Sequence, residues 1–288
     1  MNFRRHSDRS PEHFRRQPFR SRLPERFQAR RRLKAQSLTA MIPNITTLMA
    51  LCCGMTAIRF ALLEKWELAI VSVLLAAILD ALDGRLARLL NSASRFGAEL
   101  DSFSDFLSFG IAPALIMYLR GLSNWGETGW AIALFFTICM SLRLARFNVT
   151  SIEIDQPAWR EGFSTGVPAP AGGFLALYPI ILQHAIPGLA FAQNLTCYAL
   201  FMLLASGLMV SRIPTFTLKK VVVPPSLVLP FLLVLFIIIA LLYSYPWHML
   251  TAIGIIYLGL IPFSIMHFKK SEQKWKHEEM KNSKETGS

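Results

Sequence analysis

Two pairs of aspartates stand at helical spacing in a part of the chain that is rich in apolar residues. Asp80 and Asp83 are three residues apart, and Asp101 and Asp105 are four apart. This spacing puts each pair on one helix face, with Cβ atoms about 5–6 Å apart. An ionised side chain inside a membrane helix costs about 2.5–3.5 kcal/mol on insertion scales, and bare like charges repel. We therefore expect a cation between them, and oxygen donors suit Mg²⁺ or Mn²⁺.

Two residues beside the first pair point to a phosphate ligand. Gly84 follows Asp83 directly, and a glycine inside a helix costs about 1 kcal/mol relative to alanine, so its position needs a reason. The missing side chain would let a ligand approach the backbone. Arg88, one turn further on, is suited to bidentate phosphate contact. The set predicts a pyrophosphate site with two cations, although a lone aspartate could cap a helix and a lone arginine could flank a span.

The elements that carry these residues are predicted to be membrane helices. Hydrophobic residues make up 53% of the 288 and charged residues 17%, which excludes a disordered chain, a coiled coil and a secreted disulfide scaffold. Residues 221–266 contain no Lys, Arg, Asp or Glu. Spans of about 20 residues fit an all-α polytopic membrane protein with about eight transmembrane helices. They are predicted at 44–63, 68–90, 99–119, 127–146, 169–188, 195–211, 223–243 and 247–267.

The charges between these spans predict the orientation. The formal net charge is +12, and residues 1–40 alone hold 12 Lys/Arg against 3 Asp/Glu. Positive charge recurs in every second connection, on the side of both basic termini. The positive-inside rule therefore places both termini and the aspartate site in the cytoplasm. Beside membrane spans such a basic arm contacts anionic lipid more often than nucleic acid, so we expect no nucleic-acid partner.

The four aspartates, Gly84 and Arg88 also match the pattern of a known family. The spacing reads Asp80-x2-Asp83-Gly84-x2-Ala87-Arg88-x8-Gly97-x3-Asp101-x3-Asp105. It resembles, without a departure, the signature of the CDP-alcohol phosphatidyltransferases. The resemblance implies a six-helix core, a homodimer, a site in which the four aspartates share two divalent cations, and Asp105 as the proton acceptor. It further implies CDP contacts by Gly84, Arg88, Ser94 and the turn Pro43-Asn44-Ile45-Thr46.

Further stretches resemble the members of that family that use serine as the acceptor alcohol. They are residues 104–113, 143–148 and 163–170, of which the last departs slightly from the usual Phe-x-Gly-Leu-Pro, and residues 211–215 resemble the longer bacterial members. The implied reaction moves a phosphatidyl group from CDP-diacylglycerol to L-serine, with CMP released, in a bacterial inner (cytoplasmic) membrane. Serine's carboxylate needs a cationic donor, which Arg143 or Arg146 could supply, with a hydrogen bond from Asn148. The alternative is that both arginines only flank the span at the inner leaflet.

The resulting division of the chain has four parts. A basic cytoplasmic arm covers residues 1–40, the catalytic core 41–220, two additional helices 221–267, and a charged cytoplasmic tail 268–288. Three other functions stay open on sequence alone. They are a sibling enzyme that uses glycerol 3-phosphate or inositol phosphate, a cation-coupled transporter whose ion path is the aspartates, and a structural membrane protein that anchors through its basic arm.

Overall fold

The computed structural model describes residues 38–90, 92, 94–152, 163–211, 214–216 and 228–285. The basic arm expected over residues 1–40 lies outside them, except for its last three residues. All described residues belong to one compact unit that spans Leu38–Ser288.

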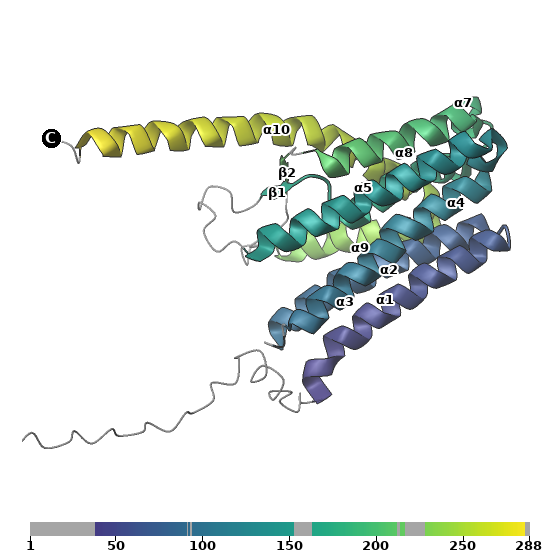
Figure 1. Cartoon of the computed structure of the whole chain (residues 1–288), viewed down its shortest axis with the longest axis horizontal. Coiled ribbons are helices and arrows are strands. Elements are labelled where there is room, and N and C mark those ends of the chain that lie inside the picture. Colours follow the sequence, from purple (N-terminus) through teal and green to yellow (C-terminus); the bar gives the residue numbers. More distant parts are fainter. Residues whose placement is uncertain are drawn as a thin grey trace, which may run out of the picture. The chain divides into compact units, whose positions relative to one another are not determined.

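The described part of the chain is helical apart from two short strands (Figure 1). The α-helices are α1 (Leu38–Leu62), α2 (Trp66–Leu89), α3 (Arg95–Asp105), α4 (Ala112–Arg120), α5 (Glu127–Ile152), α6 (Ala169–Ala185), α7 (Ala190–Gln193), α8 (Leu195–Val210), α9 (Val228–Ser244) and α10 (Pro246–Glu285). A π-helical turn, η3 (Phe106–Ile111), joins α3 to α4, and a 3₁₀ turn, η4 (Leu122–Trp125), follows α4. The strands are β1 (Phe163–Thr165) and β2 (Pro214–Phe216).

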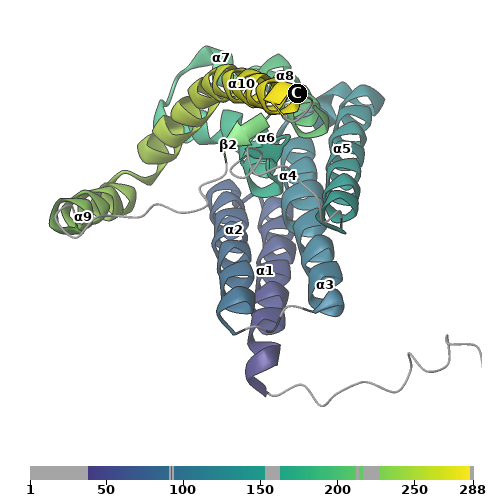
Figure 2. The ribbon, with the colours of Figure 1, turned by 90° about the vertical axis from the view of Figure 1, so that its left-hand side faces the viewer.

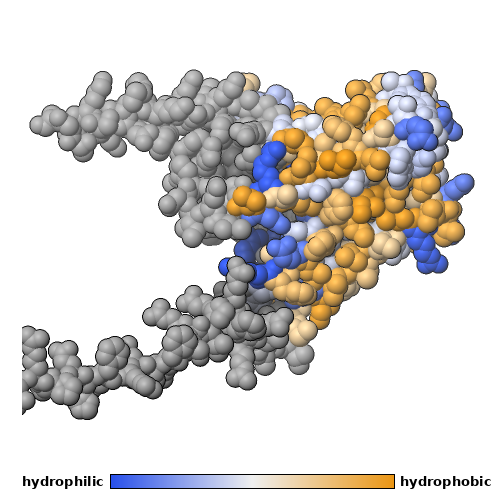
Figure 3. Space-filling view, in the orientation of Figure 1, coloured by the Kyte–Doolittle hydropathy of each residue, from blue (hydrophilic) through white to orange (hydrophobic). Residues whose placement is uncertain are grey.

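Several helices have the length and composition of membrane spans. Four stretches qualify within the described residues: Met41–Leu62, Arg95–Arg120, Glu127–Val149 and Pro246–Ser264. Shorter apolar helices cover Leu195–Val210 and Leu232–Ser244. Apolar residues extend across the face shown in Figure 3, and hydrophilic residues gather towards its two ends. The expected all-α polytopic membrane architecture is confirmed, while the count of eight spans stays a prediction because α2 is rich in charge and α6 has only 17 residues.

Small residues let α1 and α2 pack closely along their length. Ala50, Ala57 and Ala61 of α1 are fully buried, as are Ala69 and Ala76 of α2. Small side chains of this kind are typical of helix contacts in membranes, since they allow the backbones to approach. Figure 2 shows α1, α2 and α3 side by side, and the common core continues over η3 and α6. This packing brings the two aspartate-bearing helices, α2 and α3, onto one scaffold helix.

Serine hydroxyls fix α3 and η3 against α1. Ser104 Oγ donates to the carbonyl of Thr47 at 3.2 Å, and Ser108 Oγ donates to the carbonyl of Ala50 at 3.3 Å. Gly54 permits this approach, because a Cβ there would overlap Ser108. The π-helical turn begins directly after Asp105, and such turns in otherwise α-helical segments are frequent at functional sites. The last two aspartates therefore sit on a helix that is hydrogen-bonded to α1 at two successive turns.

The two strands form an antiparallel pair that the sequence analysis did not anticipate. Phe163 pairs with Phe216 and Thr165 with Pro214, which ties the entry of α6 to the segment after α8. Gly166 follows with φ of 81°, a left-handed conformation that favours glycine. Pro168 then precedes α6 as its N-terminal flanking residue. Gly166 and Pro168 thus lie in the short connection between strand β1 and helix α6.

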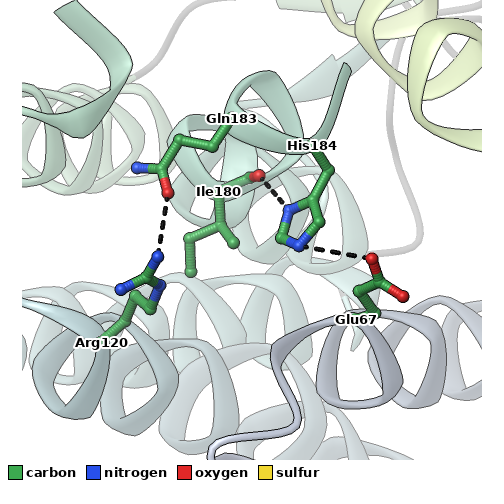
Figure 4. A network of polar contacts seen from close by, with 5 residues as sticks. All are labelled: Glu67, Arg120, Ile180, Gln183 and His184. Carbon is green, nitrogen blue, oxygen red and sulfur yellow. Dashed lines mark hydrogen bonds and ion pairs between the residues drawn. The ribbon is translucent and has the colours of Figure 1, made fainter. Parts of the chain in front are cut away.

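A second group of polar contacts ties α2, α4, α6 and α8 together away from the aspartates (Figure 4). Arg120 Nη2 donates to Gln183 Oε1 at 3.3 Å, and Gln183 Nε2 donates to the hydroxyl of Tyr198 at 2.6 Å. His184 Nε2 lies 3.6 Å from Glu67 Oε1. Asp83 follows Glu67 by 16 residues, roughly 24 Å along a helix, so these contacts stand at the other end of the bundle.

Candidate active site

Three carboxylates from two helices meet in one place. Asp80 of α2 and Asp101 and Asp105 of α3 each offer an oxygen, and these oxygens all lie within 4.8 Å of one another. The Oδ1 atoms of Asp101 and Asp105 are buried and have no hydrogen-bond partner among the described residues. A buried polar atom without a partner calls for an explanation such as an ion. An all-oxygen donor set of this kind fits a hard divalent cation.

Asp83 lies beside this group of three and is held from α1. Its Oδ2 accepts a 2.6 Å hydrogen bond from Thr47 Oγ1, and the aspartate is buried. Thr47 was not among the residues singled out in the sequence, although it directly follows the predicted nucleotide turn. The structure therefore brings three of the four aspartates together, and it places the fourth between them and α1.

A small pocket of about 150 Å³ lies between α1, α2 and the start of α3. Four of the residues predicted to contact nucleotide line it: Pro43, Asn44, Gly84 and Ser94. The rest of its wall is Thr47, Asp83, Ala87, Ser92, Gly97, Ala98 and Asp101. All the glycines of the family pattern, and two of its aspartates, therefore face one pocket.

Three predicted nucleotide contacts stand outside that wall. Ile45 is exposed, and Thr46 Oγ1 donates to the carbonyl of Ile42 within its own helix at 3.1 Å. Arg88 is exposed at the end of α2, and its Nε donates to the carbonyl of Gly84 at 2.9 Å. The guanidinium of Arg88 is thus folded back along α2, next to the glycine with which it was expected to act.

Local chemistry explains how α3 begins at the pocket. Ser94 precedes α3, and its Oγ accepts a hydrogen bond from the amide of Gly97 at 3.0 Å, as N-cap serines do. A Cβ at Gly97 would lie 2.9 Å from Asn44 Oδ1, tighter than ordinary contact. Gly97 is therefore required by the close approach of α3 to α1. At Gly84, by contrast, a Cβ would meet no atom within 4 Å among the described residues outside the adjoining backbone of α2. The empty space at Gly84 suits a ligand.

A larger cavity of about 830 Å³ opens on the other side of the aspartates. It shares Asp83, Gly84, Ala98 and Asp101 with the small pocket. Its wall also contains Asp80, Arg95, Glu99, Ser102, Asp105, Arg143, Leu144, Phe147, Asn148, Pro168 and Pro170. One continuous region therefore runs from the small pocket, past the carboxylates, to α5 and the entry of α6.

The two candidate arginines for the acceptor differ in position. Arg143 lines the large cavity, where its charge interacts with Asp80 and Asp105. Arg146 instead donates from Nη1 to the carbonyls of Val210 at 2.9 Å and Ser211 at 3.5 Å. The last carbonyls of a helix have no partner within the helix and often accept hydrogen bonds from a basic side chain. Arg146 therefore stabilises the end of α8.

Asn148 also faces the large cavity. Its Nδ2 donates to Ser102 Oγ at 3.0 Å, a contact that joins α5 to α3 across the site. Ser102 is another cavity residue that sequence reasoning missed, since a serine one residue after Asp101 has many possible roles in a helix. Of the acceptor candidates, Arg143 and Asn148 are therefore brought to the aspartates, and Arg146 is directed elsewhere.

The chain matches two family models. Residues 40–210 match the model described as CDP-alcohol phosphatidyltransferase, and residues 226–262 match that described as CDP-alcohol phosphatidyltransferase 2. The first match covers α1 to α8 and every aspartate of the site. The chain belongs to the CDP-alcohol phosphatidyltransferase family, a family of phospholipid-synthesising transferases.

Several proteins that are similar to this chain are named for one activity. A protein of Mycobacterium tuberculosis (strain H37Rv) is 37% identical over 225 residues, 78% of each chain. One of Helicobacter pylori (strain 26695) is 35% identical over 184 residues, 63% of this chain and 74% of the relative. One of Methanocaldococcus jannaschii is 39% identical over 134 residues, 46% of this chain and 57% of the relative. All three are named CDP-diacylglycerol–serine O-phosphatidyltransferase.

Proposed function

We propose that this chain transfers the phosphatidyl group of CDP-diacylglycerol to the hydroxyl of L-serine and so forms phosphatidylserine and CMP. The observation that carries the proposal is the single continuous region in which the small pocket, the carboxylates and Arg143 meet. The names of the relatives support serine as the acceptor. The rate of CMP release with each acceptor distinguishes L-serine from the alternatives glycerol 3-phosphate and inositol phosphate.

The small pocket binds the nucleotide in this proposal. Asn44 and Ser94 offer polar side chains to the cytidine, and Gly84 lets the pyrophosphate approach the backbone of α2. Arg88 leaves the carbonyl of Gly84 and turns its guanidinium to the pyrophosphate, a bidentate contact to which arginine is suited. Pro43 also lines this pocket, while Ile45 and Thr46, which the sequence predicted to belong to a turn, are part of helix α1 and lie outside the pocket wall.

Two divalent cations, Mg²⁺ or Mn²⁺, are proposed at the aspartates. Asp80, Asp101 and Asp105 would hold one of them, and Asp83 with Asp80 and Asp101 the other. The fit rests on the three converging carboxylates and on the unpartnered buried oxygens of Asp101 and Asp105. When bound, such cations neutralise charge on the pyrophosphate and make CMP a better leaving group. Cations bound between the four carboxylates would then offset the repulsion among their negative charges.

The proposed chemistry on the acceptor side uses three residues of the large cavity. Arg143 and Asn148 orient serine through its carboxylate, and Asp105 accepts the proton of its hydroxyl. The serine oxygen attacks the phosphorus that carries the diacylglycerol, and the bond from that phosphorus to the CMP oxygen breaks. General base assistance of this kind contributes typically about 10²–10⁴-fold. A single direct displacement inverts the configuration at phosphorus.

The proposed setting is a cytoplasmic membrane with both termini and the site on the cytoplasmic side. The alternation of positive charge between spans supports it, together with the apolar helices. A homodimer and the division into arm (1–40), core (41–220), two further helices (221–267) and tail (268–288) are proposed on the same basis as in the sequence analysis. Membrane lipid, CDP-diacylglycerol, L-serine and CMP are then the partners.

CMP release by the purified full chain tests the function. The protein in detergent receives CDP-diacylglycerol and Mn²⁺ or Mg²⁺, with L-serine, glycerol 3-phosphate, an inositol phosphate or no acceptor. We expect CMP release at least about tenfold faster with L-serine than with the other acceptors, and phosphatidylserine as the lipid product. A stronger response to a phosphorylated acceptor would reassign the substrate. Cation uptake into sealed vesicles without CMP release would instead support the transporter alternative.

A further inference from the structure

Helix α10 lies beyond residues 40–210, the part of the chain that matches the first family model, yet it packs beside the site. It rests on α6 and on β2 (Figure 2). The second family model, over residues 226–262, includes its N-terminal half. Pro168 and Pro170, at the entry of α6, line the large cavity. Helix α10 therefore borders the element that closes the cavity on the side proposed for the acceptor.

Two contacts fix the register of α10 on α6. Tyr178 of α6 donates from its hydroxyl to the carbonyl of Thr251 at 2.7 Å. A Cβ at Gly254 would overlap the ring of Tyr178, so the two helices approach closely at this point. Tyr257 follows three residues after the buried Gly254, on the same helix face. The docking of α10 therefore directs Tyr257 towards the interior of the bundle.

The hydroxyl of Tyr257 is buried and has no hydrogen-bond partner among the described residues. The rest of its side chain packs against the hydrophobic core. A buried hydroxyl without a partner calls for an explanation, because almost all such groups in proteins are hydrogen-bonded. The guanidinium of Arg143 on α5 is close enough to interact electrostatically with this hydroxyl. Helix α10 thus brings an unused polar group to the arginine of the acceptor side.

Arg143 also lacks a hydrogen-bond partner among the described residues. Its guanidinium lies over the ring of Phe147, 5.7 Å from the ring centroid, and both side chains line the large cavity. The carboxylates of Asp80 and Asp105 attract the same guanidinium. An arginine that forms an ion pair with a carboxylate of the protein is no longer available to the carboxylate of a substrate. The site therefore needs a group that keeps Arg143 turned to the acceptor.

We propose that Tyr257 positions Arg143: with the acceptor in the cavity, the phenol oxygen accepts one N–H of the guanidinium and leaves the others to the acceptor's carboxylate. That the acceptor is L-serine rests on the proposed function. The guanidinium has several N–H donors in a fixed planar fork, so one can be held while two face a carboxylate. A neutral hydroxyl holds the arginine without competing for its charge. Tyr257 is thus a positioning residue that α10 supplies.

Tyr257→Phe tests the proposal, since it removes the hydroxyl and keeps the ring. We expect the KM for L-serine to rise about tenfold, as for the loss of one hydrogen bond to a charged group. The kcat should stay within about threefold of wild type, and the KM for CDP-diacylglycerol within about twofold. The melting temperature without L-serine should be unchanged or higher, because the deleted hydroxyl has no partner among the described residues. An unchanged KM for L-serine in the folded variant would overturn the proposal.

Tyr178→Phe is the matched control, because it makes the same change in a tyrosine that joins α6 to α10. It loses the hydrogen bond to the carbonyl of Thr251 and should lower the melting temperature, with the KM for L-serine within about twofold of wild type. A rise in this KM as large as in Tyr257→Phe would show that looser docking of α10 is sufficient to disturb the site. That result would also overturn the proposal.

The double variant with Arg143→Gln and Tyr257→Phe tests whether Tyr257 acts through Arg143. Residues that act through one another have non-additive effects. We therefore expect the KM for L-serine to lie within about twofold of that of Arg143→Gln alone. Effects that multiply would give Tyr257 an independent role and contradict the positioning of Arg143. A wild type whose CMP release does not respond to L-serine would count against the proposed function alone, and the same variants are then compared by the KM for the acceptor that the wild type uses.

Discussion

Thr47 of α1 donates a 2.6 Å hydrogen bond from its Oγ1 to Oδ2 of Asp83 on α2. The same residue accepts a hydrogen bond at its carbonyl from Ser104 of α3. One position of α1 therefore holds a carboxylate of α2 and fixes α3, the helix that carries Asp101 and Asp105. The scaffold helix takes part in the site without contributing a carboxylate.

Thr47→Val should weaken the site without removing a carboxylate. The valine keeps the volume of threonine and deletes the donor to Asp83, and a hydrogen bond to a charged group is worth about 1.5–3 kcal/mol. We expect the metal concentration for half-maximal activity to rise about tenfold or more, measured by titration with Mn²⁺. Thr56→Val is the matched control, since Thr56 Oγ1 donates to the carbonyl of Cys52 within α1 at 2.7 Å. Equal effects of both variants would show that Thr47 acts through helix stability alone.

The Asp105→Asn variant should show whether Asp105 acts as the proton acceptor or only as a metal ligand. Chelation of the wild type is expected to abolish turnover, and Mg²⁺ or Mn²⁺ to restore it. If Asp105 accepts the serine proton, turnover of the variant stays at least about 10²-fold below wild type at saturating metal, because a positioned base contributes that much. Full recovery at high metal would make Asp105 a ligand only. Glu64→Gln, in the turn between α1 and α2 away from the cavities, serves as the control.

The two glycines of the signature should respond differently to alanine. A Cβ at Gly84 would meet no described atom within 4 Å beyond the adjoining backbone of its own helix, so Gly84→Ala is expected to leave the melting temperature unchanged or higher. The same change should raise the KM for CDP-diacylglycerol about tenfold. At Gly97 the new Cβ would press on Asn44 and on the Ser94 hydroxyl that caps α3. Gly97→Ala should therefore lower the melting temperature as well. Thermal unfolding in detergent, measured beside KM, distinguishes the two; a lower melting temperature in Gly84→Ala would contradict the ligand space.

The two arginines of α5 should have different roles: Arg143 in the binding of serine and Arg146 in the stability of the fold. Arg143→Gln removes one of the two arginines that line the large cavity and is expected to raise the KM for L-serine about 10–100-fold, while the KM for CDP-diacylglycerol changes little. Arg146→Gln loses the contacts to the carbonyls of Val210 and Ser211 and should lower the melting temperature, with the KM for L-serine within about twofold of wild type. Steady-state kinetics and unfolding of both variants provide the comparison. A large serine effect in Arg146→Gln would return that residue to the acceptor site.

The sequence was sufficient for the helices and for the aspartates because both follow from strong local costs. An apolar run of about 20 residues is long enough to form a membrane helix. A carboxylate within such a helix needs a cation or a hydrogen-bonding partner. Helical spacing then placed Asp101 and Asp105 on one face, and the structure brings Asp80 to them. The family pattern added the glycines and the small pocket that they line.

The contacts that spacing alone could not predict depend on distant parts of the chain. Arg143 and Arg146 lie three residues apart with similar surroundings in the sequence, and their difference comes from where α8 ends, 64 residues after Arg146. Thr47 bonds the carbonyl of Pro43 in its own helix as many threonines do, and only tertiary packing adds Asp83. The π-helical turn after Asp105 and the three-residue strands are too short to leave a periodic signal.

The polar contacts around Arg120, Gln183 and His184 have a mechanical consequence. They fasten α2, α4, α6 and α8 at the end remote from the aspartates, and His184 also stacks on Trp247 of α10 with ring centroids 4.7 Å apart. Because these contacts lie far from the carboxylates, they join the helices independently of the site, and a substitution at an aspartate leaves them in place. A loss of turnover in such a variant can therefore be measured apart from a loss of folding.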